Sequence, residues 1–229
     1  MRPPLLDARL NTALAMVRPG SVVADVGTDH GHLALHLILS GKCPKVYALD
    51  VREKPLGKAR ALAARFGFEG QISCILSDGL AALPANAAQD VVIAGMGALS
   101  IAQIIANANW LQNDDVRLVL VPASNVPLLR QTLCEMGFEV KEEQAVQAAG
   151  RYYTVMCVHY SGRCYTPSAL FCQVGKVPAQ TPAAVGYIEK VIALQKTELN
   201  GKALSTRFEL GEKAALVTAL EGVLAQCRK

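Results

Sequence analysis

Three aspartates stand at the ends of three apolar stretches that follow one another along the chain. Asp25 lies near the end of the first stretch, residues 21–26, Asp50 ends the second, and Asp78 follows the third. Open α/β sheets bind ligands at the carboxyl ends of their parallel strands, so we expect these carboxylates to converge. A single aspartate after a strand is often only a cap or turn former. Three of them favour a ligand pocket.

The first apolar stretch runs into a glycine-containing loop, Gly27-Thr28-Asp29-His30-Gly31, and a helical pattern then starts at Leu33. A strand, such a loop and a helix start are the arrangement that holds nucleotide-like cofactors. A dinucleotide loop needs Gly-x-Gly-x-x-Gly, but here the second and third glycine places are Asp29 and His32. The Asp29 carboxylate would repel a pyrophosphate, whereas it suits S-adenosylmethionine, which is phosphate-free and carries an ammonium and a sulfonium.

S-adenosylmethionine is therefore the expected cofactor, and a nicotinamide-dependent oxidoreductase is disfavoured. Asp29 is expected to hold the methionine ammonium, Asp50 to accept from the ribose hydroxyls, and Asp78 to frame the adenine. The predicted cofactor-binding residues are Asp25, Gly27, Thr28, Asp29, His30, Gly31, Asp50, Val51, Asp78, Gly79 and Ala94.

Composition sets the protein class. The chain has 229 residues, 52% hydrophobic and 18% charged, enough for one full core and a modest appendage. Its seven cysteines are scattered, without a Cys-x-x-Cys pair, so neither a zinc site nor a disulfide framework is predicted. An apolar run typical of a signal peptide or a membrane span is also missing from the sequence. We expect a cytoplasmic protein without metal or membrane partners; the oligomeric state is open, with a monomer favoured.

Charge is unevenly distributed along the chain. Residues 1–160 carry 14 basic and 14 acidic side chains, whereas residues 161–229 carry 9 and 5. The whole net charge of +4 therefore lies in the last third. This asymmetry is compatible with a polyanionic partner and equally with an ordinary solvated helical surface.

Apolar periodicity predicts alternating strands and helices over residues 1–136. Strands are expected over 21–26, 45–50, 72–76, 90–94 and 116–121. Helices are expected over 5–17, 32–40, 54–66, 99–106 and 126–136. Alternation at this spacing predicts a doubly wound, mostly parallel sheet, because parallel neighbours need crossover connections. Two β-rich segments, 138–146 and 152–160, then predict an antiparallel hairpin at the sheet edge.

Residues 161–229 form a predicted appendage to the catalytic domain over residues 1–160. A segment containing Pro167, Pro178 and Pro182 is expected to be a linker with partial structure. Two helical patterns follow, separated by Asn200-Gly201. They predict an antiparallel helical hairpin, with docking of both helices onto the main domain as the alternative.

Three motifs resemble the bacterial tRNA (adenine(22)-N1)-methyltransferases. They are Leu6-Asp-Ala-Arg-Leu10, Asp25-Val-Gly-Thr-Asp-His-Gly31 and Ile93-Ala-Gly-Met-Gly97, and the resemblance covers nearly the whole chain. It implies the seven-stranded methyltransferase form of the doubly wound sheet, with S-adenosylmethionine as donor and N1 of an adenine in the tRNA D-arm region as acceptor. The chain departs from the family at Val121-Pro122-Ala123, where Gln-Pro-Asn is usual, and at Ala98, where glycine is usual.

Methylation of adenine N1 makes modest chemical demands. N1 of neutral adenine already has a lone pair, so no general base is required, and placement of the base dominates. N1 lies on the Watson–Crick edge, so the base must be unpaired or flipped out. Gly95, Met96 and Gly97 are predicted to shape the catalytic slot for this base; the alternative is a tight strand-to-helix turn. Arg9 is predicted to contact the substrate, with a surface salt bridge as its alternative.

Two other functions are compatible with the sequence. The first is a module that binds S-adenosylmethionine and holds RNA or protein without turnover, which the altered segment at 121–123 favours. The second is methylation of a small molecule or a protein, in which case the basic appendage would be incidental.

Overall fold

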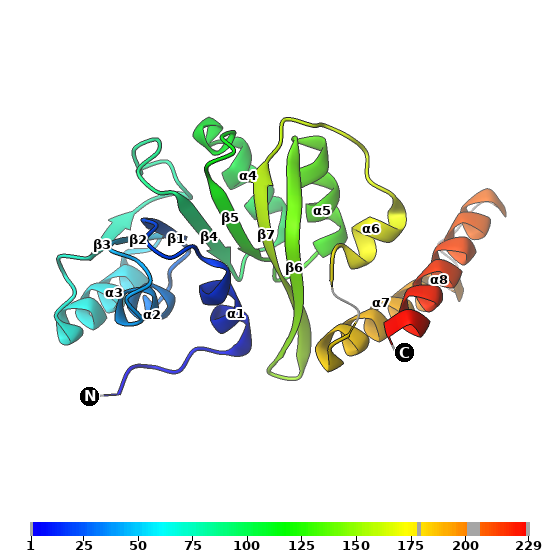
Figure 1. Cartoon of the computed structure of the whole chain (residues 1–229), viewed down its shortest axis with the longest axis horizontal. Coiled ribbons are helices and arrows are strands. Elements are labelled where there is room, and N and C mark those ends of the chain that lie inside the picture. Colours follow the sequence, from blue (N-terminus) through cyan, green and yellow to red (C-terminus); the bar gives the residue numbers. More distant parts are fainter. Residues whose placement is uncertain (1, 178–179, 201–206, 228–229) are drawn as a thin grey trace.

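A seven-stranded sheet forms the centre of the computed structural model, which describes residues 2–177, 180–200 and 207–227 (Figure 1). The strand order is β3-β2-β1-β4-β5-β7-β6. Strands β1 to β5 are parallel, and β7 pairs antiparallel with both β5 and β6. The predicted doubly wound sheet with an antiparallel edge hairpin is confirmed. The strands are β1 (Val23–Val26), β2 (Val46–Asp50), β3 (Ile72–Leu76), β4 (Asp90–Ala94), β5 (Arg117–Val121), β6 (Phe138–Ala148) and β7 (Arg151–Tyr160).

Helices cover both faces of the sheet because side chains alternate along each strand. On β4, Val92 belongs to a buried cluster with residues of α1 (Ala8–Met16), α2 (His32–Leu39) and α3 (Glu53–Phe66). Its neighbours Val91 and Ile93 point to the opposite face, where α4 (Ala98–Ala106) and α5 (Val126–Glu135) pack.

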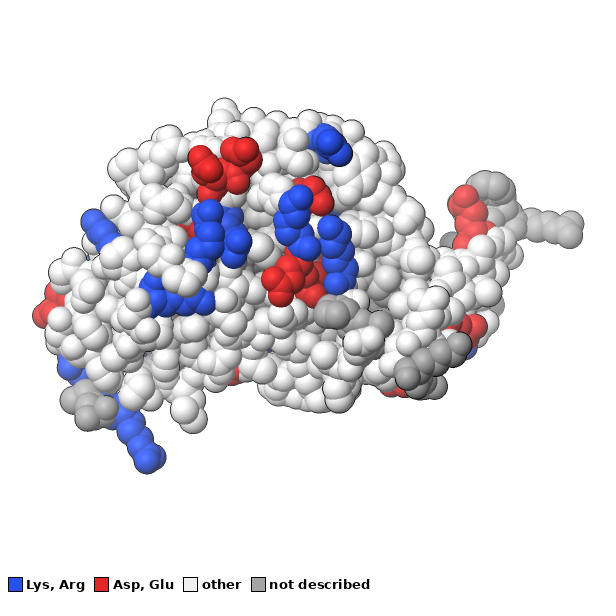
Figure 2. Space-filling model, in the orientation of Figure 1, with Lys and Arg blue, Asp and Glu red and all other residues white. Residues whose placement is uncertain are grey.

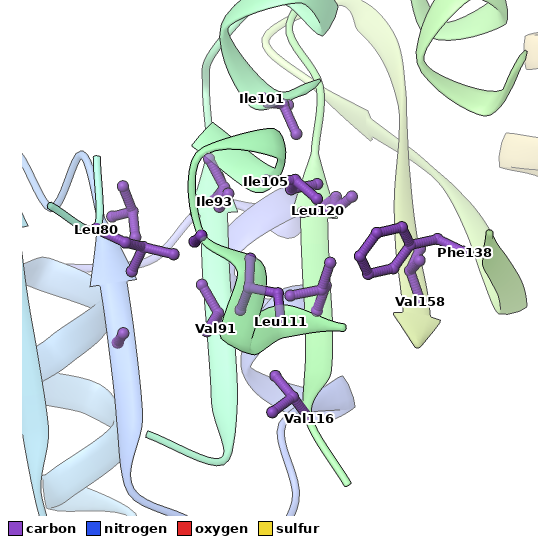
Figure 3. Close-up of a cluster of buried hydrophobic side chains, with 14 of the residues drawn as sticks. Leu80, Val91, Ile93, Ile101, Ile105, Leu111, Val116, Leu120, Phe138 and Val158 are labelled. Carbon is purple, nitrogen blue, oxygen red and sulfur yellow. The ribbon is translucent and has the colours of Figure 1, made fainter. Parts of the chain in front are cut away.

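The cluster under α4 and α5 is continuous with the short 3₁₀ helix η1 (Asn109–Leu111) (Figure 3). Ile93, Ile101, Leu111 and Leu120 are fully buried there. Burial of each such side chain contributes about 1.5–3 kcal/mol, so α4 is held firmly against the sheet. This matters for the site described below, because one face of α4 borders it.

The predicted helix over 5–17 is wrong at its start. The structure begins α1 at Ala8, because the Asp7 carboxylate accepts a hydrogen bond from the Leu10 N–H at 3.1 Å and caps the helix. Leu5 lies before this cap and is exposed. Apolar residues at helical spacing therefore also occur before the residue at which the helix begins.

Three C-terminal helices follow the sheet: α6 (Ala169–Val174), α7 (Pro182–Asn200) and α8 (Arg207–Cys227). α7 packs against edge strand β6 and against α8. The ion pairs Lys196–Glu221 and Lys213–Glu198 connect α7 and α8, and their order along the two helices shows that these run antiparallel. The start of α7 also packs on the edge hairpin of the sheet, where the Tyr152 side chain lies against Gly186. Gly201 of the predicted turn lies outside the described residues.

Among the described residues, no helix has the length and apolar character needed to cross a bilayer. The same part of the chain contains no group of three or more histidine, cysteine, aspartate or glutamate side chains arranged to hold a metal ion.

Candidate functional site

A cavity of about 670 Å³ lies at the carboxyl ends of β1, β2, β3 and β4. Pockets of this size hold small organic ligands. Nine of the predicted site residues line it: Gly27, Asp29, Asp50, Val51, Asp78, Gly79, Ala94, Gly95 and Met96. The structure therefore brings together strand ends that are far apart in sequence, such as Val26 of β1 and Ala94 of β4, as the parallel order requires.

A smaller cavity of about 190 Å³ adjoins the first and shares Gly27, Asp29, Ala94 and Gly95 with it. Its further lining includes the predicted residues Arg9, Asp25, Thr28 and His30. The φ of Gly27 is +72°, a conformation that favours glycine. A Cβ atom at this position would lie 2.5 Å from the Met96 methyl carbon, so the Met96 side chain would have to move. The Met96 side chain therefore packs directly on the loop that follows β1.

Asp50 ties two loops of the larger cavity together. Its side chain is 5% exposed, and its carboxylate accepts hydrogen bonds from the backbone N–H groups of Asp29 at 3.2 Å and Arg52 at 2.9 Å. Each carboxylate oxygen has a second lone pair, so Asp50 can also accept from a ligand hydroxyl.

Asp29 stands at the rim of both cavities. Its side chain is 58% exposed, and its backbone adopts a left-handed conformation with φ of 53°. Oδ2 lies 2.7 Å from Nδ1 of His30, and Oδ1 lies 3.9 Å from the Arg52 guanidinium. The Asp29 carboxylate is thus accessible to a ligand but bordered by two basic side chains.

Asp25 differs from the other acids because it is almost fully buried, at 3% exposed. The Thr28 hydroxyl donates a 2.6 Å hydrogen bond to its Oδ2. Burial raises the pKa of the Asp25 carboxyl to about 6, against the opposing effect of the Thr28 hydrogen bond. Asp25 therefore supports the loop from beneath.

Two predicted site residues lie outside both cavities. Gly31 begins α2 and contacts α3, where a Cβ atom would come within 2.9 Å of the Ala59 Cβ. Gly97 begins α4 and forms an isolated bridge with Ser124, whose Oγ would lie 3.2 Å from an added Cβ. Both glycines permit close packing of the elements that frame the cavities.

Arg9 forms a surface ion pair beside the smaller cavity. Its guanidinium pairs with Asp7 at 2.6 Å and lies over the Tyr153 ring at 4.6 Å. The side chain also lines the smaller cavity. The surface salt bridge is therefore present, and it holds the guanidinium beside the site.

One wall of the larger cavity was not identified from the sequence. It is formed by Ser100, Gln103 and Ile104 of α4 and by Asn107 and Ala108, which follow that helix. This wall approaches the end of β3 closely, since a Cβ atom on Gly79 would lie 2.9 Å from Cγ1 of Ile104. Ser100, Gln103 and Asn107 recur at i, i+3 and i+7, which indicates a polar stripe on an otherwise apolar segment but not that this stripe borders a cavity.

The combined lining suits a ligand that carries positive charge and hydroxyl groups. Asp29, Asp50 and Asp78 border the larger cavity, and Arg52 is its one basic lining residue. Arg52 is already directed at Asp50 and Asp29. A carboxylate-rich pocket without a phosphate cradle fits S-adenosylmethionine better than a dinucleotide.

The sheet order and the strand-end pocket are those of doubly wound α/β proteins that bind nucleotide-like ligands. The reversed strand β7 and the acidic lining agree with the methyltransferase form expected from the motifs. The chain belongs to the methyltransferase domain family, whose model matches residues 6–156.

Within this family, the chain is similar to proteins named as tRNA methyltransferases. The tRNA (adenine(22)-N(1))-methyltransferase of Bacillus subtilis is 27% identical over 158 residues, which span 69% of this chain and 66% of that enzyme. The Streptococcus pneumoniae protein Sp1610, solved in complex with S-adenosyl-L-methionine, is 26% identical with a TM-score of 0.81, covering 96% of this chain and 100% of that one. The solved Bacillus subtilis M1A22 tRNA methyltransferase TrmK shares the fold, with 23% identity, a TM-score of 0.81, and coverage of 98% and 99%. The resemblance seen in the sequence motifs is confirmed.

Proposed function

We propose that this protein is an S-adenosylmethionine-dependent tRNA methyltransferase that methylates N1 of adenine 22. The observation that carries the proposal is the meeting of Asp29, Asp50 and Asp78 around one strand-end cavity in a chain of the methyltransferase domain family. The name of the Bacillus relative supports the acceptor, and the complex of the Streptococcus relative supports the donor. We expect a cytoplasmic enzyme.

The predicted residues each bind a different group of the donor. Asp29 faces the ammonium, Asp50 accepts from the ribose hydroxyls, and Asp78 frames the adenine. The remaining cofactor set supplies backbone contacts and loop shape: Asp25, Gly27, Thr28, His30, Gly31, Val51, Gly79 and Ala94. When bound, the donor supplies a methyl group on a sulfonium.

The chain's contribution to methyl transfer is placement of the base. Gly95 is exposed, has a φ of +80°, and has no atom within 4 Å of the position where a Cβ would stand. A planar base can therefore approach the backbone closely at this point. Met96 and Gly97 complete the slot, one by covering Gly27 and the other by starting α4. Transfer to the N1 lone pair then needs orientation and exclusion of water.

Contacts with tRNA phosphates are assigned to basic side chains on the protein surface. Figure 2 shows lysines and arginines gathered over the middle of one face, with acidic side chains beside them. We assign residues 1–160 to catalysis and residues 161–229, with their excess of basic side chains, to sequence-independent RNA contacts. Arg9 is placed to contact a phosphate or the base near the smaller cavity.

Methyl incorporation into defined transcripts tests the proposal. The protein is incubated with methyl-labelled S-adenosylmethionine and a tRNA transcript, with the same transcript carrying guanine at position 22 as the matched control. We expect label in the first transcript only, and 1-methyladenosine at position 22 after nuclease digestion and mass spectrometry. Equal label in both transcripts would contradict the assigned position. Donor binding without label in any tRNA would favour the module without turnover.

A further inference from the structure

A chain of three charged or ionisable side chains runs from helix α3 to the rim of the donor cavity. Nζ of Lys58 lies 2.8 Å from Nε2 of His30, and Nδ1 of the same ring lies 2.7 Å from Oδ2 of Asp29. Lys58 belongs to α3, whereas His30 and Asp29 belong to the loop after β1. Two elements that are separate in the sequence therefore meet at the carboxylate assigned to the donor ammonium.

The chemistry of the three groups fixes the direction of these hydrogen bonds. A lysine ammonium can only donate, so Nε2 of His30 must accept. The ring proton then resides on Nδ1 and is donated to Asp29. The result is a directed relay, Lys58 to His30 to Asp29, through a neutral imidazole in a single tautomer.

Close packing of α3 makes the relay possible. A Cβ atom on Gly31 would lie 2.9 Å from Cβ and 3.1 Å from Cα of Ala59, so a glycine is needed for this approach. Ala59 is the next residue after Lys58. This gives Gly31, which lines neither cavity, a role at the site: it brings Lys58 within reach of His30.

We propose that His30 and Lys58 are positioning residues that hold the Asp29 carboxylate toward the α-ammonium of the donor. This inference rests on the proposed function. Asp29 is exposed, and its Oδ1 lies 3.9 Å from the Arg52 guanidinium, which competes for the same carboxylate. The hydrogen bond from His30 holds Oδ2 in place before the donor arrives. Fixing the side chain in advance reduces the ordering cost of binding.

Calorimetric binding of two ligands to the Lys58→Met variant tests the relay. S-adenosylmethionine carries the ammonium, whereas 5′-methylthioadenosine keeps the adenosine and a methylated sulfur, now a neutral thioether, and lacks the amino-acid portion. We expect Kd for S-adenosylmethionine to rise about threefold to fivefold, the upper part of the range for exposed charged pairs, with Kd for methylthioadenosine unchanged. Lys58→Arg, which can still donate, should restore binding. Lys54→Met removes a lysine from the same helix and should alter neither Kd.

A second background separates positioning from a general effect on the loop. In Asp29→Asn, addition of Lys58→Met should produce no further loss, because the carboxylate that the relay orients is gone. The relay is overturned if Lys58→Met weakens both ligands equally, weakens neither, or acts fully in Asp29→Asn. In each of these cases, normal donor binding and tRNA methylation by the unaltered protein would leave the proposed function intact. A folded, unaltered protein that binds no donor would overturn both proposals.

Discussion

Two networks of charged side chains occupy opposite parts of this molecule, and their surroundings differ sharply. The relay of Asp29, His30 and Lys58 is exposed at the rim of the donor cavity. Arg130 and Glu143, by contrast, are fully buried where the C-terminal helices meet the sheet. Desolvation makes an unpaired buried charge costly, whereas water replaces a lost exposed partner. The exposed network is therefore suited to tuning a ligand contact, and the buried one to fixing the architecture.

Arg130 serves four elements at once. From α5, its guanidinium pairs with Glu143 of β6 at 2.6 Å and donates to the Cys172 and Gln173 carbonyls of α6 at 2.6 and 2.8 Å. A further bond of 3.1 Å reaches the Tyr187 hydroxyl of α7. The C-terminal helices are thus joined to the sheet by a fully hydrogen-bonded buried charge.

The largest expected effect comes from breaking this buried pair. Arg130→Met should lower the free energy of unfolding by about 3–5 kcal/mol, because it leaves the Glu143 carboxylate buried without its partner. Denaturant titration followed by circular dichroism measures the change. Arg130→Met with Glu143→Met removes both charges and should recover most of the loss. If Arg130→Met alone were as stable as the unaltered protein, the buried network would contribute no more to stability than the exposed one.

Asp25 tests whether burial or location decides the energetic cost of a charge, since it is buried but lies in β1, directly beneath the loop that follows that strand. Its pKa is raised from 3.8 to about 6 in the folded protein. The folded state therefore binds this proton more tightly than the unfolded chain, and the associated stability is lost as the pH rises from about 4 through 6. Asp25 should therefore lower the free energy of unfolding by up to about 3 kcal/mol as the pH rises through this range, and Asp25→Asn should abolish that decline because asparagine does not titrate. The measurement is the stability difference between the two proteins at several pH values.

A flat difference across that pH range would show that Asp25 titrates as an ordinary exposed carboxyl. The donor loop would then contain no energetic counterpart of the buried pair. The contrast between the two regions would follow location and not burial.

Asp50 allows the effect of a buried carboxylate to be measured on donor affinity instead of on stability. Asp50→Ala removes the acceptor for two backbone N–H groups and for the donor hydroxyls, so donor affinity should fall about 100-fold. Calorimetry with S-adenosylmethionine measures this loss, and circular dichroism checks that the sheet is retained. Asp50→Asn keeps one acceptor oxygen, so its donor affinity should lie between that of Asp50→Ala and that of the unaltered protein. Unchanged affinity in Asp50→Ala would refute the donor assignment.

The sequence predicted the parts of this molecule that depend on local pattern. Strands 72–76 and 90–94 were predicted with the bounds that the structure gives, because each apolar run is bounded by polar or turn-forming residues. The acids at strand ends were identified because parallel order forces strand ends together. The early start given to α1 shows the limit of periodicity, since the Asp7 cap overrides the apolar spacing.

Features that depend on tertiary packing were not predictable. The α4 wall borders the cavity only because Ile104 packs on Gly79. Nothing local marks Arg130 and Glu143 as partners, since one lies on a helix and the other on the edge hairpin. The contact of Gly31 with Ala59 likewise depends on how α3 crosses the loop. Each of these is a close approach between elements, and composition and spacing carry no information about it.

The smallest expected effect comes from an exposed pair in the C-terminal helices. Lys196 and Glu221 lie 2.6 Å apart with side chains about half exposed, and they connect α7 to α8. Lys196→Met should change the free energy of unfolding by less than about 1 kcal/mol, because water solvates the remaining carboxylate. Chemical denaturation under the same conditions as for Arg130→Met gives the comparison. A loss as large as that of Arg130→Met would mean that the C-terminal region, and not burial, governs the cost. A small loss of stability in Lys196→Met would indicate that desolvation, and not position in the fold, sets the cost of breaking a charge pair.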